Sequence, residues 1–210
     1  MNQLTHERMT QSQVRVPVAV SPSHVHLTPA VIEQLFCDHY RLHERDRLGP
    51  AHFATQESVT LIGPRARLTG IRVIGPARRM NQVELSLTDA LRLGIDAPER
   101  APGDLEGTPG IVIKGPRMEF TLKVGVIRAL PHLHMTPHDA DRFGLADRDL
   151  ADVISESDAR RIMFRAVPVQ VSADHRFELH LDVDAGKAAG LASGDHVSLR
   201  KHPRLAAART

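Results

Sequence analysis

A six-residue motif that occurs twice constrains the fold of this chain more than any other feature. Residues 24–29 read HVHLTP, and residues 132–137, which begin 108 positions later, read HLHMTP. Chance recurrence of a histidine-x-histidine pair followed by an apolar residue and Thr-Pro is improbable in a chain of 210 residues. We therefore expect two equivalent halves, each with its own histidine pair.

A second pair of segments extends the repeat. Residues 83–90 (VELSLTDA) align with residues 179–186 (LHLDVDAG), and each segment leads into a short helical pattern that ends in Leu-Gly or Ala-Gly. Glu84 in the first half thus stands where His180 stands in the second. Each half gains a third candidate ligand, and the two triads are His24, His26 and Glu84, and His132, His134 and His180.

The two triads have the chemistry of metal sites. In an extended strand, side chains at positions i and i+2 lie on the same face, about 6.6 Å apart along the chain, so two imidazoles can converge on one ion. Three protein ligands leave one position of a tetrahedral zinc ion open, as in catalytic sites. One histidine-x-histidine pair alone fits two surface histidines on an edge strand equally well. Its repetition, with a third ligand in register, favours two metal sites.

Cysteine usage narrows the choice of ligands. Cys37 is the only cysteine, which excludes an intramolecular disulfide and a zinc site built from several thiolates. The same count agrees with a reducing compartment. Residues 28–37 predict a helix with Thr28 as its N-cap and Pro29 as its first residue, and we expect the Cys37 thiol at its end to be buried and inert.

Short apolar segments, separated by Gly and Pro, predict the fold class. We expect strands at residues 16–20, 58–62, 66–74, 82–87, 110–113, 119–127, 150–155, 161–168, 169–172 and 177–181, and further short helices at 88–93, 136–143 and 184–189. The long alternating helices of a parallel α/β sheet are missing from this pattern. The sequence therefore predicts a mainly β fold with short α-helices, arranged as β-barrels or sandwiches.

The charge balance limits the partners. The chain has 27 basic and 25 acidic residues without a sustained basic run, and only 3% of its residues are aromatic, so we expect no nucleic-acid partner. Most of the basic residues are Arg, whose planar guanidinium suits small phosphorylated ligands. No segment is apolar enough to span a membrane, and residues 1–15 lack the apolar core of a secretory signal. We expect a soluble, cytoplasmic protein.

Residues 75–84 join a Gly-Pro turn to a pair of arginines just before Glu84. We expect Arg78 to lie near the first triad, where its cation could hold phosphate or stabilise an oxyanion. The alternative is a solvated loop arginine.

Four motifs, in order between residues 16 and 200, carry a resemblance to a known family. They are V-x-V-x-x-S-x-x-H-V-H-L from Val16, G-P-x-R-x-x-x-Q-V-E-x-S-x-x-D-A-x-x-L-G-I from Gly75, H-x-H-M-T-P-x-D-A from His132 and H-x-D-x-D from His180. In these motifs the chain resembles the phosphate propanoyltransferase (PduL-type phosphotransacylase) family.

The resemblance implies a domain organisation. It implies two closely packed β-barrels, related by the internal repeat and capped by short helices. Residues 22–129 would form the first barrel domain, and residues 14–21 together with 130–203 would form the second. We expect residues 1–13 to be a flexible leader and residues 204–210 to be a tail.

The resemblance also implies the site. It implies two zinc ions per chain, one on His24, His26 and Glu84 with the coenzyme A sulfur at the open position, and one on His132, His134 and His180. Arg78 matches the active-site arginine of the family and, with Ser21 and His52, is a substrate-binding candidate. The chain departs from the family at Ser23 and Pro131, where arginines are usual, at His52, where glutamine is usual, and in residues 185–187.

The implied activity is that of a phosphotransacylase, which reversibly converts a short-chain acyl-CoA, propanoyl-CoA or similar, and phosphate into acyl-phosphate and CoA. A zinc-dependent thioester hydrolase and a non-catalytic metal- or ligand-binding relative are the alternatives. The resemblance further suggests propanediol degradation, a location free in the cytoplasm or inside a bacterial microcompartment, and a homo-oligomer or microcompartment proteins as partners.

Overall fold

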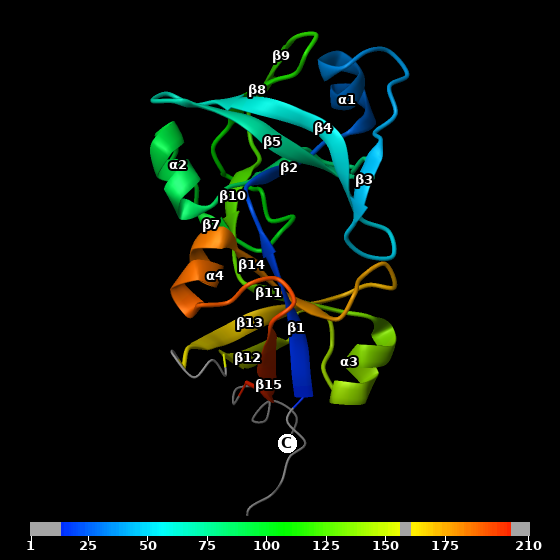
Figure 1. Ribbon diagram of the computed structural model, residues 1–210, viewed down its shortest axis with the longest axis vertical. Helices are drawn as coiled ribbons and strands as arrows, with labels where there is room; N and C mark the ends of the chain where they lie inside the picture. The colour runs from blue at the N-terminus through cyan, green and yellow to red at the C-terminus, as the bar shows by residue number, and fades with distance from the viewer. Residues whose placement is uncertain (1–13, 156–160, 203–210) are drawn as a thin grey trace, which may run out of the picture.

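The computed structural model describes residues 14–155 and 161–202, so the leader and tail expected at residues 1–13 and 204–210 lie outside the described residues. The described residues form fifteen strands and four short helices. The strands build two sheets, one above the other along the longest axis of the molecule (Figure 1). The predicted fold class, mainly β with short helices, is confirmed.

One sheet closes into a barrel of six strands. Its order is β1 (Val14–Ser21), β14 (Glu178–Asp182), β11 (His132–Met135), β13 (Met163–Val171), β12 (Leu150–Ser155) and β15 (His196–Lys201), with β15 pairing back to β1. Alternate side chains of these strands fill the barrel, including Val16, Leu133, Met135 and Leu179, which are all fully buried. Burial of one such side chain stabilises the fold by roughly 1.5–3 kcal/mol relative to exposure.

The other sheet has nine strands and curls into a half-barrel without closing. Its order is β7 (Glu99–Arg100), β10 (Val126–Ala129), β6 (Gln82–Glu84), β2 (His24–His26), β5 (Arg67–Gly75), β4 (Phe53–Ile62), β8 (Ile111–Lys114) and β9 (Glu119–Leu122), and β3 (Glu44–Arg47) pairs with β4 beside this path. A second apolar core fills its concave side, with Val25, Leu61 and Ile113 among its fully buried side chains.

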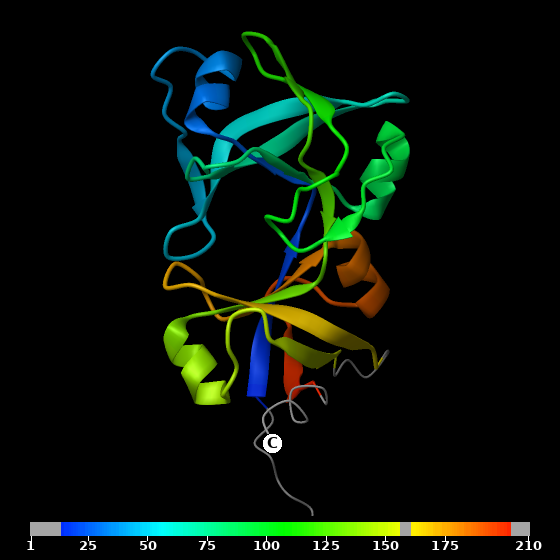
Figure 2. The same cartoon turned by 180° about the vertical axis from the view of Figure 1, so that it is seen from behind.

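The two sheets repeat the same pairing around their histidine strands. Strand β2 pairs in parallel with β5 and antiparallel with β6, and β11 pairs in parallel with β13 and antiparallel with β14. The strand that precedes each histidine strand belongs to the other sheet: β1 pairs with β14 of the barrel, and β10 pairs with β6 of the curled sheet. The chain therefore crosses between the sheets after β1 and again after β10, and the back view shows these two segments passing between the sheets (Figure 2).

Four helices flank the sheets, and each begins at a residue whose side chain accepts a hydrogen bond from its first turn. They are α1 (Pro29–Leu35), α2 (Leu87–Leu93), α3 (Pro137–Phe143) and α4 (Val183–Ala189), capped by Thr28, Ser86, Thr136 and Asp182. The glycines after α2, α3 and α4 have positive φ, which favours a residue without a Cβ. All four predicted helices are confirmed, but α1 ends at Leu35. The expectation of a buried Cys37 is wrong, because this residue lies beyond the helix and is exposed.

Two strand predictions were too long. The segment predicted at 82–87 ends at Glu84, because Ser86 caps α2. The segment predicted at 119–127 divides into β9 and β10 around Gly125, whose φ of 136° interrupts the strand. Conversely, the two segments predicted at 161–168 and 169–172 form the single strand β13, Met163–Val171.

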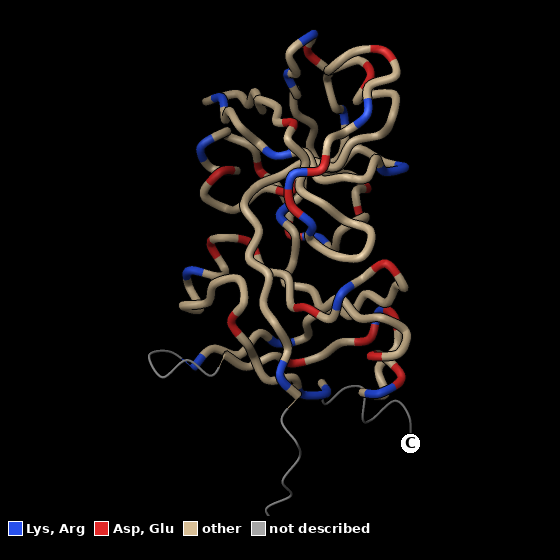
Figure 3. The backbone as a smooth tube through the Cα atoms, turned by 45° about the vertical axis from the view of Figure 1, so that its right-hand side comes forward, with Lys and Arg blue, Asp and Glu red and all other residues tan. Residues whose placement is uncertain are grey.

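Acidic and basic residues are interspersed along the described backbone of both sheets in the charge-coloured trace (Figure 3). Within the described part of the chain, no helix has the length and apolar character needed to cross a membrane.

Candidate active site

Strand register brings each predicted triad together. His24 lies opposite Glu84 in the β2–β6 pair, and His132 lies opposite His180 in the equivalent β11–β14 pair. Between the two histidines of each motif, Val25 and Leu133 point into the apolar cores. Because side chains alternate along a strand, this anchoring turns the four imidazoles to the opposite face.

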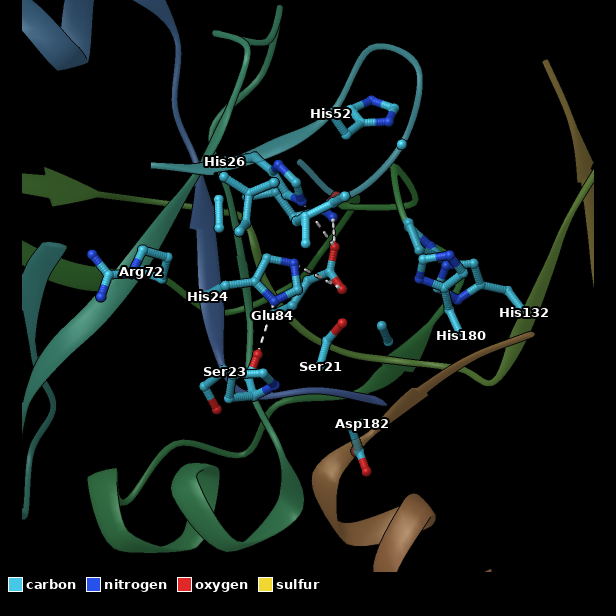
Figure 4. Close-up of a pocket in the computed structure, with 18 of the residues that line it drawn as sticks. Ser21, Ser23, His24, His26, His52, Arg72, Glu84, His132, His180 and Asp182 are labelled. Atoms are coloured by element: carbon cyan, nitrogen blue, oxygen red, sulfur yellow. Dashed lines mark hydrogen bonds and ion pairs between the residues drawn. The ribbon is translucent and has the colours of Figure 1, made fainter. Parts of the chain in front are cut away.

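The first triad is a compact group of two imidazoles and a carboxylate. His24 Nε2 lies 3.6 Å from Glu84 Oε2, and His26 Nε2 lies 3.5 Å from Glu84 Oε1. Gln82 Nε2 donates a 2.6 Å hydrogen bond to Glu84 Oε1 and so orients the carboxylate. Figure 4 shows the two rings on β2 facing Glu84 from one side.

The second triad consists of three imidazoles. The ring centroids are 4.9 Å apart for His132 and His134, 5.2 Å for His132 and His180, and 4.1 Å for His134 and His180. Gln170 Oε1 lies 3.2 Å from His134 Nε2. Glu178 Oε2 lies 3.7 Å from His180 Nε2, so a carboxylate is also present beside this group.

Both triads fit a metal ion. In each, the three ligand atoms lie within 4.8 Å of one another. His24 Nδ1 donates to the Pro22 carbonyl at 3.0 Å, and His132 Nδ1 donates to the Leu130 carbonyl at 2.8 Å. These carbonyls hold the Nδ1–H tautomer, which leaves the Nε2 lone pair for a metal, as is usual for metal-binding histidines. Within the described residues, His26 Nδ1 is the one buried side-chain nitrogen or oxygen without a hydrogen-bond partner.

Electrostatics distinguish the two groups. Burial lowers the pKa of His24, but the Glu84 carboxylate outweighs this effect and the pKa is raised. Burial alone would raise the pKa of Glu84, but His24 and His26 hold it well below its usual range. In the second triad burial dominates: it lowers the pKa of His134 and His132 and, with the charge of His132, lowers that of His180 to about 3. A set of neutral imidazoles is the state that binds a metal.

The two triads open onto one cavity of about 840 Å³, which residues of both sheets line. The other predicted site residues, Ser21, His52 and Arg78, line the same cavity. Ser21 ends β1 next to Asp182 of β14, and the close-up shows it below Glu84. His52 lies on the loop between β3 and β4, at the edge of the pocket. The Arg78 N–H donates to the Leu27 carbonyl at 2.8 Å, which fixes its loop beside β2.

The departure at Ser23 has a structural explanation. Ser23 is 6% exposed, its hydroxyl donates a 2.6 Å hydrogen bond to Asp89 Oδ2, and its Oγ accepts one of 3.0 Å from the Ser86 N–H. Ser23 therefore joins β2 to the first turn of α2. Nothing in the structure explains the replacement at Pro131.

Sequence reasoning missed several residues of the site. Among them are Gln82, Gln170, His175 and Glu178, which all line the cavity. Gln82 and Glu178 precede Glu84 and His180 by two positions, so the strand period offered a signal for both. His175 is half-buried and stacks on His134 with ring centroids 3.8 Å apart. Its position depends on tertiary contacts and had no local signal.

The fold and the site define a β protein in which two repeat-related sheets place potential metal centres at a shared pocket. Comparison with known proteins identifies the family. A family model described as phosphate propanoyltransferase matches residues 17–192. A phosphate propanoyltransferase of Thermotoga maritima is 44% identical over 191 residues, which cover 90% of this chain and 91% of the relative.

Two further relatives carry the same name. The phosphate propanoyltransferase of Citrobacter koseri is 44% identical over 189 residues, with 90% of each chain covered. That of Salmonella typhimurium is 42% identical over 175 residues, with 83% of each chain covered. The chain therefore belongs to the phosphate propanoyltransferase family, and the protein is an acyltransferase.

Proposed function

We propose that the protein is a zinc phosphotransacylase that transfers a short acyl group between coenzyme A and phosphate, with propanoyl-CoA or a similar thioester as substrate. The observation that supports this most is the pair of triads, contributed by the two sheets, at one cavity with Arg78 on its wall. Two reactants held in one pocket react in an effectively unimolecular step, which is a large part of what such a site supplies.

The donor chemistry supports zinc, with two ions per chain. One triad offers two imidazoles and a carboxylate and the other three imidazoles, and both sets leave a tetrahedral ion one open position. When bound, zinc supplies a Lewis acid that stabilises a thiolate and polarises a carbonyl. Pro22, Leu130 and Gln82 would keep the ligand atoms of His24, His132 and Glu84 oriented for it.

The reaction needs no covalent acyl-enzyme. A phosphate oxygen attacks the thioester carbonyl carbon, a C–O bond forms, the C–S bond breaks, and the electron pair leaves with the CoA sulfur. Arg78 would hold the phosphate oxygens and orient them toward the thioester, since its fork donates two parallel hydrogen bonds. Ser21, at the junction of β1 and the pocket, would contact the substrate from the barrel side.

The test is phosphate-dependent CoA release. The purified protein is given acetyl, propanoyl and butanoyl thioesters with and without phosphate, acyl-phosphate is trapped with hydroxylamine, and metal content is measured. We expect CoA and acyl-phosphate in equal amounts, only when phosphate is present, with about two zinc ions per chain. CoA release without phosphate would instead identify a thioester hydrolase. If the metal-loaded protein releases no CoA under either condition, it is a non-catalytic relative.

The partners in this proposal are acyl-CoA and phosphate. Four further predictions rest on the family resemblance alone. They are a homo-oligomer, microcompartment proteins as partners, a cytoplasmic or microcompartment location, and a role in propanediol degradation. The division into domains at residues 22–129 and at 14–21 with 130–203 also stays a prediction.

A further inference from the structure

The carboxylate of Glu178 faces the second triad from the strand that carries His180. These two residues are two positions apart on β14, so their side chains lie on the same face of the strand. Glu178 Oε2 lies 3.7 Å from His180 Nε2, and Glu178 is directly opposite His134 in the β11–β14 pair. The side chain of Glu178 is only 13% exposed and lines the cavity. A largely buried carboxylate therefore lies beside a ring nitrogen of the second triad.

The first triad contains the same arrangement. Glu84 Oε2 lies 3.6 Å from His24 Nε2, and Glu84 Oε1 accepts a hydrogen bond from Gln82, two positions earlier in the chain. Glu178 Oε2 likewise faces an imidazole, and its Oε1 accepts a 3.3 Å hydrogen bond from Arg176 Nη1, also two positions earlier. In both cases one oxygen is held by a neighbouring side chain and the other is turned toward a histidine nitrogen. Glu178 thus repeats the environment of Glu84, displaced by two residues along the equivalent strand.

The distance from Glu178 to His180 fits two ligands of one ion. Ligand atoms about 2.0–2.2 Å from a tetrahedral zinc ion lie about 3.3–3.6 Å from one another. The 3.7 Å in the second triad is close to this range and to the two carboxylate–imidazole distances of the first triad, 3.5 and 3.6 Å. Among the described residues, Arg176 is the only one that donates a hydrogen bond to this carboxylate, and it donates to Oε1. Oε2 is therefore available to a cation, which a carboxylate so little exposed requires.

We propose that Glu178 is a fourth protein ligand of the metal ion at the second triad. The three imidazoles supply nitrogens, and Glu178 supplies an oxygen to the position that the triad alone leaves open. Glu178 does not belong to the group whose ligand atoms lie within 4.8 Å of one another, so a rotation of its side chain completes the set. Four protein ligands are typical of a structural zinc site, and three with an open position are typical of a catalytic one. The inference rests on the two metal ions of the proposed function, and it leaves the open position to the first triad alone.

The first experiment counts open positions in the wild-type protein. Cobalt(II) replaces zinc at both triads, and a small thiol, ethanethiol, is added while the thiolate-to-cobalt absorption band is followed. We expect one thiolate per chain although two cobalt ions are bound. Two thiolates would overturn the proposal, because the ion at the second triad would then have an open position as well. No bound thiolate would also overturn it, because the first triad would then lack the open position.

The second experiment removes the carboxylate by Glu178→Ala. The ion at the second triad then loses a ligand, so the number of bound thiolates should rise from one to two. The affinity of that site for zinc, measured by competition with a chelator, should fall by more than about 100-fold, because loss of a contact that only orients a ligand typically costs about 10–100-fold. The control is Glu119→Ala on β9, which changes neither quantity. Glu119 is an exposed carboxylate outside the cavity and has a comparable ion pair, 3.3 Å from Lys114 Nζ.

The thiolate count also decides between a ligand and a positioning residue. If Glu178→Ala keeps both cobalt ions and still binds one thiolate, the proposal is overturned, and Glu178 only orients His180. If the second triad stays empty even in excess cobalt, the proposal is supported, because the loss of affinity exceeds that of an orienting contact. Should Glu178→Ala not fold, the count in the wild-type protein still tests the proposal.

Neither readout depends on turnover, which separates this inference from the proposed function. If the metal-loaded protein shows no phosphate-dependent CoA release, the proposed function fails. One thiolate in wild type and two in Glu178→Ala would still support the assignment of Glu178. Conversely, phosphate-dependent CoA release together with two thiolates in wild type would overturn the assignment of Glu178 and leave the proposed function intact.

Discussion

His24 and His132 take their orientation from the backbone two residues earlier. The carbonyls of Pro22 and Leu130 accept from the two Nδ1 atoms although the residues between them, Ser23 and Pro131, differ. An arginine at either of these positions is therefore not needed to orient the imidazoles. The repeat preserves a backbone geometry, which tolerates changes in the intervening side chain.

Substitution of Arg78 should reduce activity without reducing the stability of the fold. Its side chain is exposed toward the cavity, and the hydrogen bond that fixes its loop comes from its backbone. We expect Arg78→Ala to lower kcat/KM by about 100-fold. Arg78→Lys should be nearly as poor, because an ammonium group cannot replace the bidentate hydrogen bonds of a guanidinium. Thermal unfolding should be unchanged. The control is Arg41→Ala, which changes an exposed arginine outside the cavity. Full turnover in both Arg78 variants would show that Arg78 is a solvated loop arginine without a role in the reaction.

Gln82 acts through Glu84. The 2.6 Å bond from Gln82 Nε2 fixes one carboxylate oxygen, and Gln82 Oε1 accepts from the Gly103 N–H at 2.8 Å. Removing a hydrogen bond that orients a metal ligand typically weakens metal affinity by about 10–100-fold. We expect Gln82→Leu to weaken zinc binding at one of two sites, measured by competition with a chelator of known affinity. Equal weakening at both sites, or at neither, would contradict this role.

At the scale of elements, local signals predicted the helices better than the strands. Each helix has a capping side chain at its start, and the last three have a glycine at their end, so both boundaries are encoded within a few residues. The strands β3, β7 and β15 were not predicted. All residues of β3 and β7 are exposed and charged or polar, so they lack the apolar alternation that marks a strand, and pairing with a neighbour forms them instead.

The residues before β3 are attached to β4 by a buried carboxylate. Glu57 has a side chain 4% exposed and accepts from Tyr40 Oη at 3.0 Å and from His43 Nδ1 at 2.7 Å. Burial alone would raise the pKa of Glu57, but the hydrogen bonds from His43 and Tyr40 outweigh it and the pKa is lowered. The β3–β4 loop carries His52, so this contact supports one wall of the pocket.

A lowered pKa in the folded state fixes the direction of the pH effect. The stabilisation is fully present above the unfolded pKa of Glu57, about 4.3, and is lost as the pH falls through the folded value. We expect Glu57→Gln to cost about 1–3 kcal/mol of unfolding free energy at pH 7. Between about pH 5 and 3 the difference from wild type should shrink. Denaturant unfolding across this range measures it, and a difference that grows toward low pH would contradict the assignment.

At the scale of the whole molecule, the site depends on how the two sheets lie relative to each other, and the sequence repeat alone could not predict this arrangement. The repeat predicted both triads, because register follows from the pairing of equivalent strands. It could not predict that both would face one cavity, since that depends on the exchange of β1 and β10 between the sheets. His175 is placed by contacts within the barrel: it follows β13, and its ring stacks on His134 of β11, a tertiary contact that no local pattern predicts.

The carboxylate of Asp184 links the helices α2 and α4, which flank different sheets. Asp184, in the first turn of α4, accepts a 2.8 Å hydrogen bond from the Thr88 N–H in the first turn of α2. The two helices lie one above the other at one side of the molecule (Figure 1). The hydrogen bond from Thr88 is the main cause of the lowered pKa of Asp184. The negative charge lies at two helix N-termini, where the helix dipoles favour it.

Asp184 should therefore affect both stability and the relative position of the sheets. We expect Asp184→Ala to lower the free energy of unfolding by about 1 kcal/mol, the usual cost of a lost helix cap, and Asp184→Asn, which keeps an acceptor oxygen, to lower it less. Because the triads belong to different sheets, a looser junction should also lower kcat for phosphate-dependent CoA release while both metal sites stay filled. Thermal unfolding, zinc content and turnover are measured on the same preparations. If Asp184→Ala loses stability but keeps full turnover, the contact is only a helix cap, and the alignment of the two triads is maintained by the strands β1 and β10 alone.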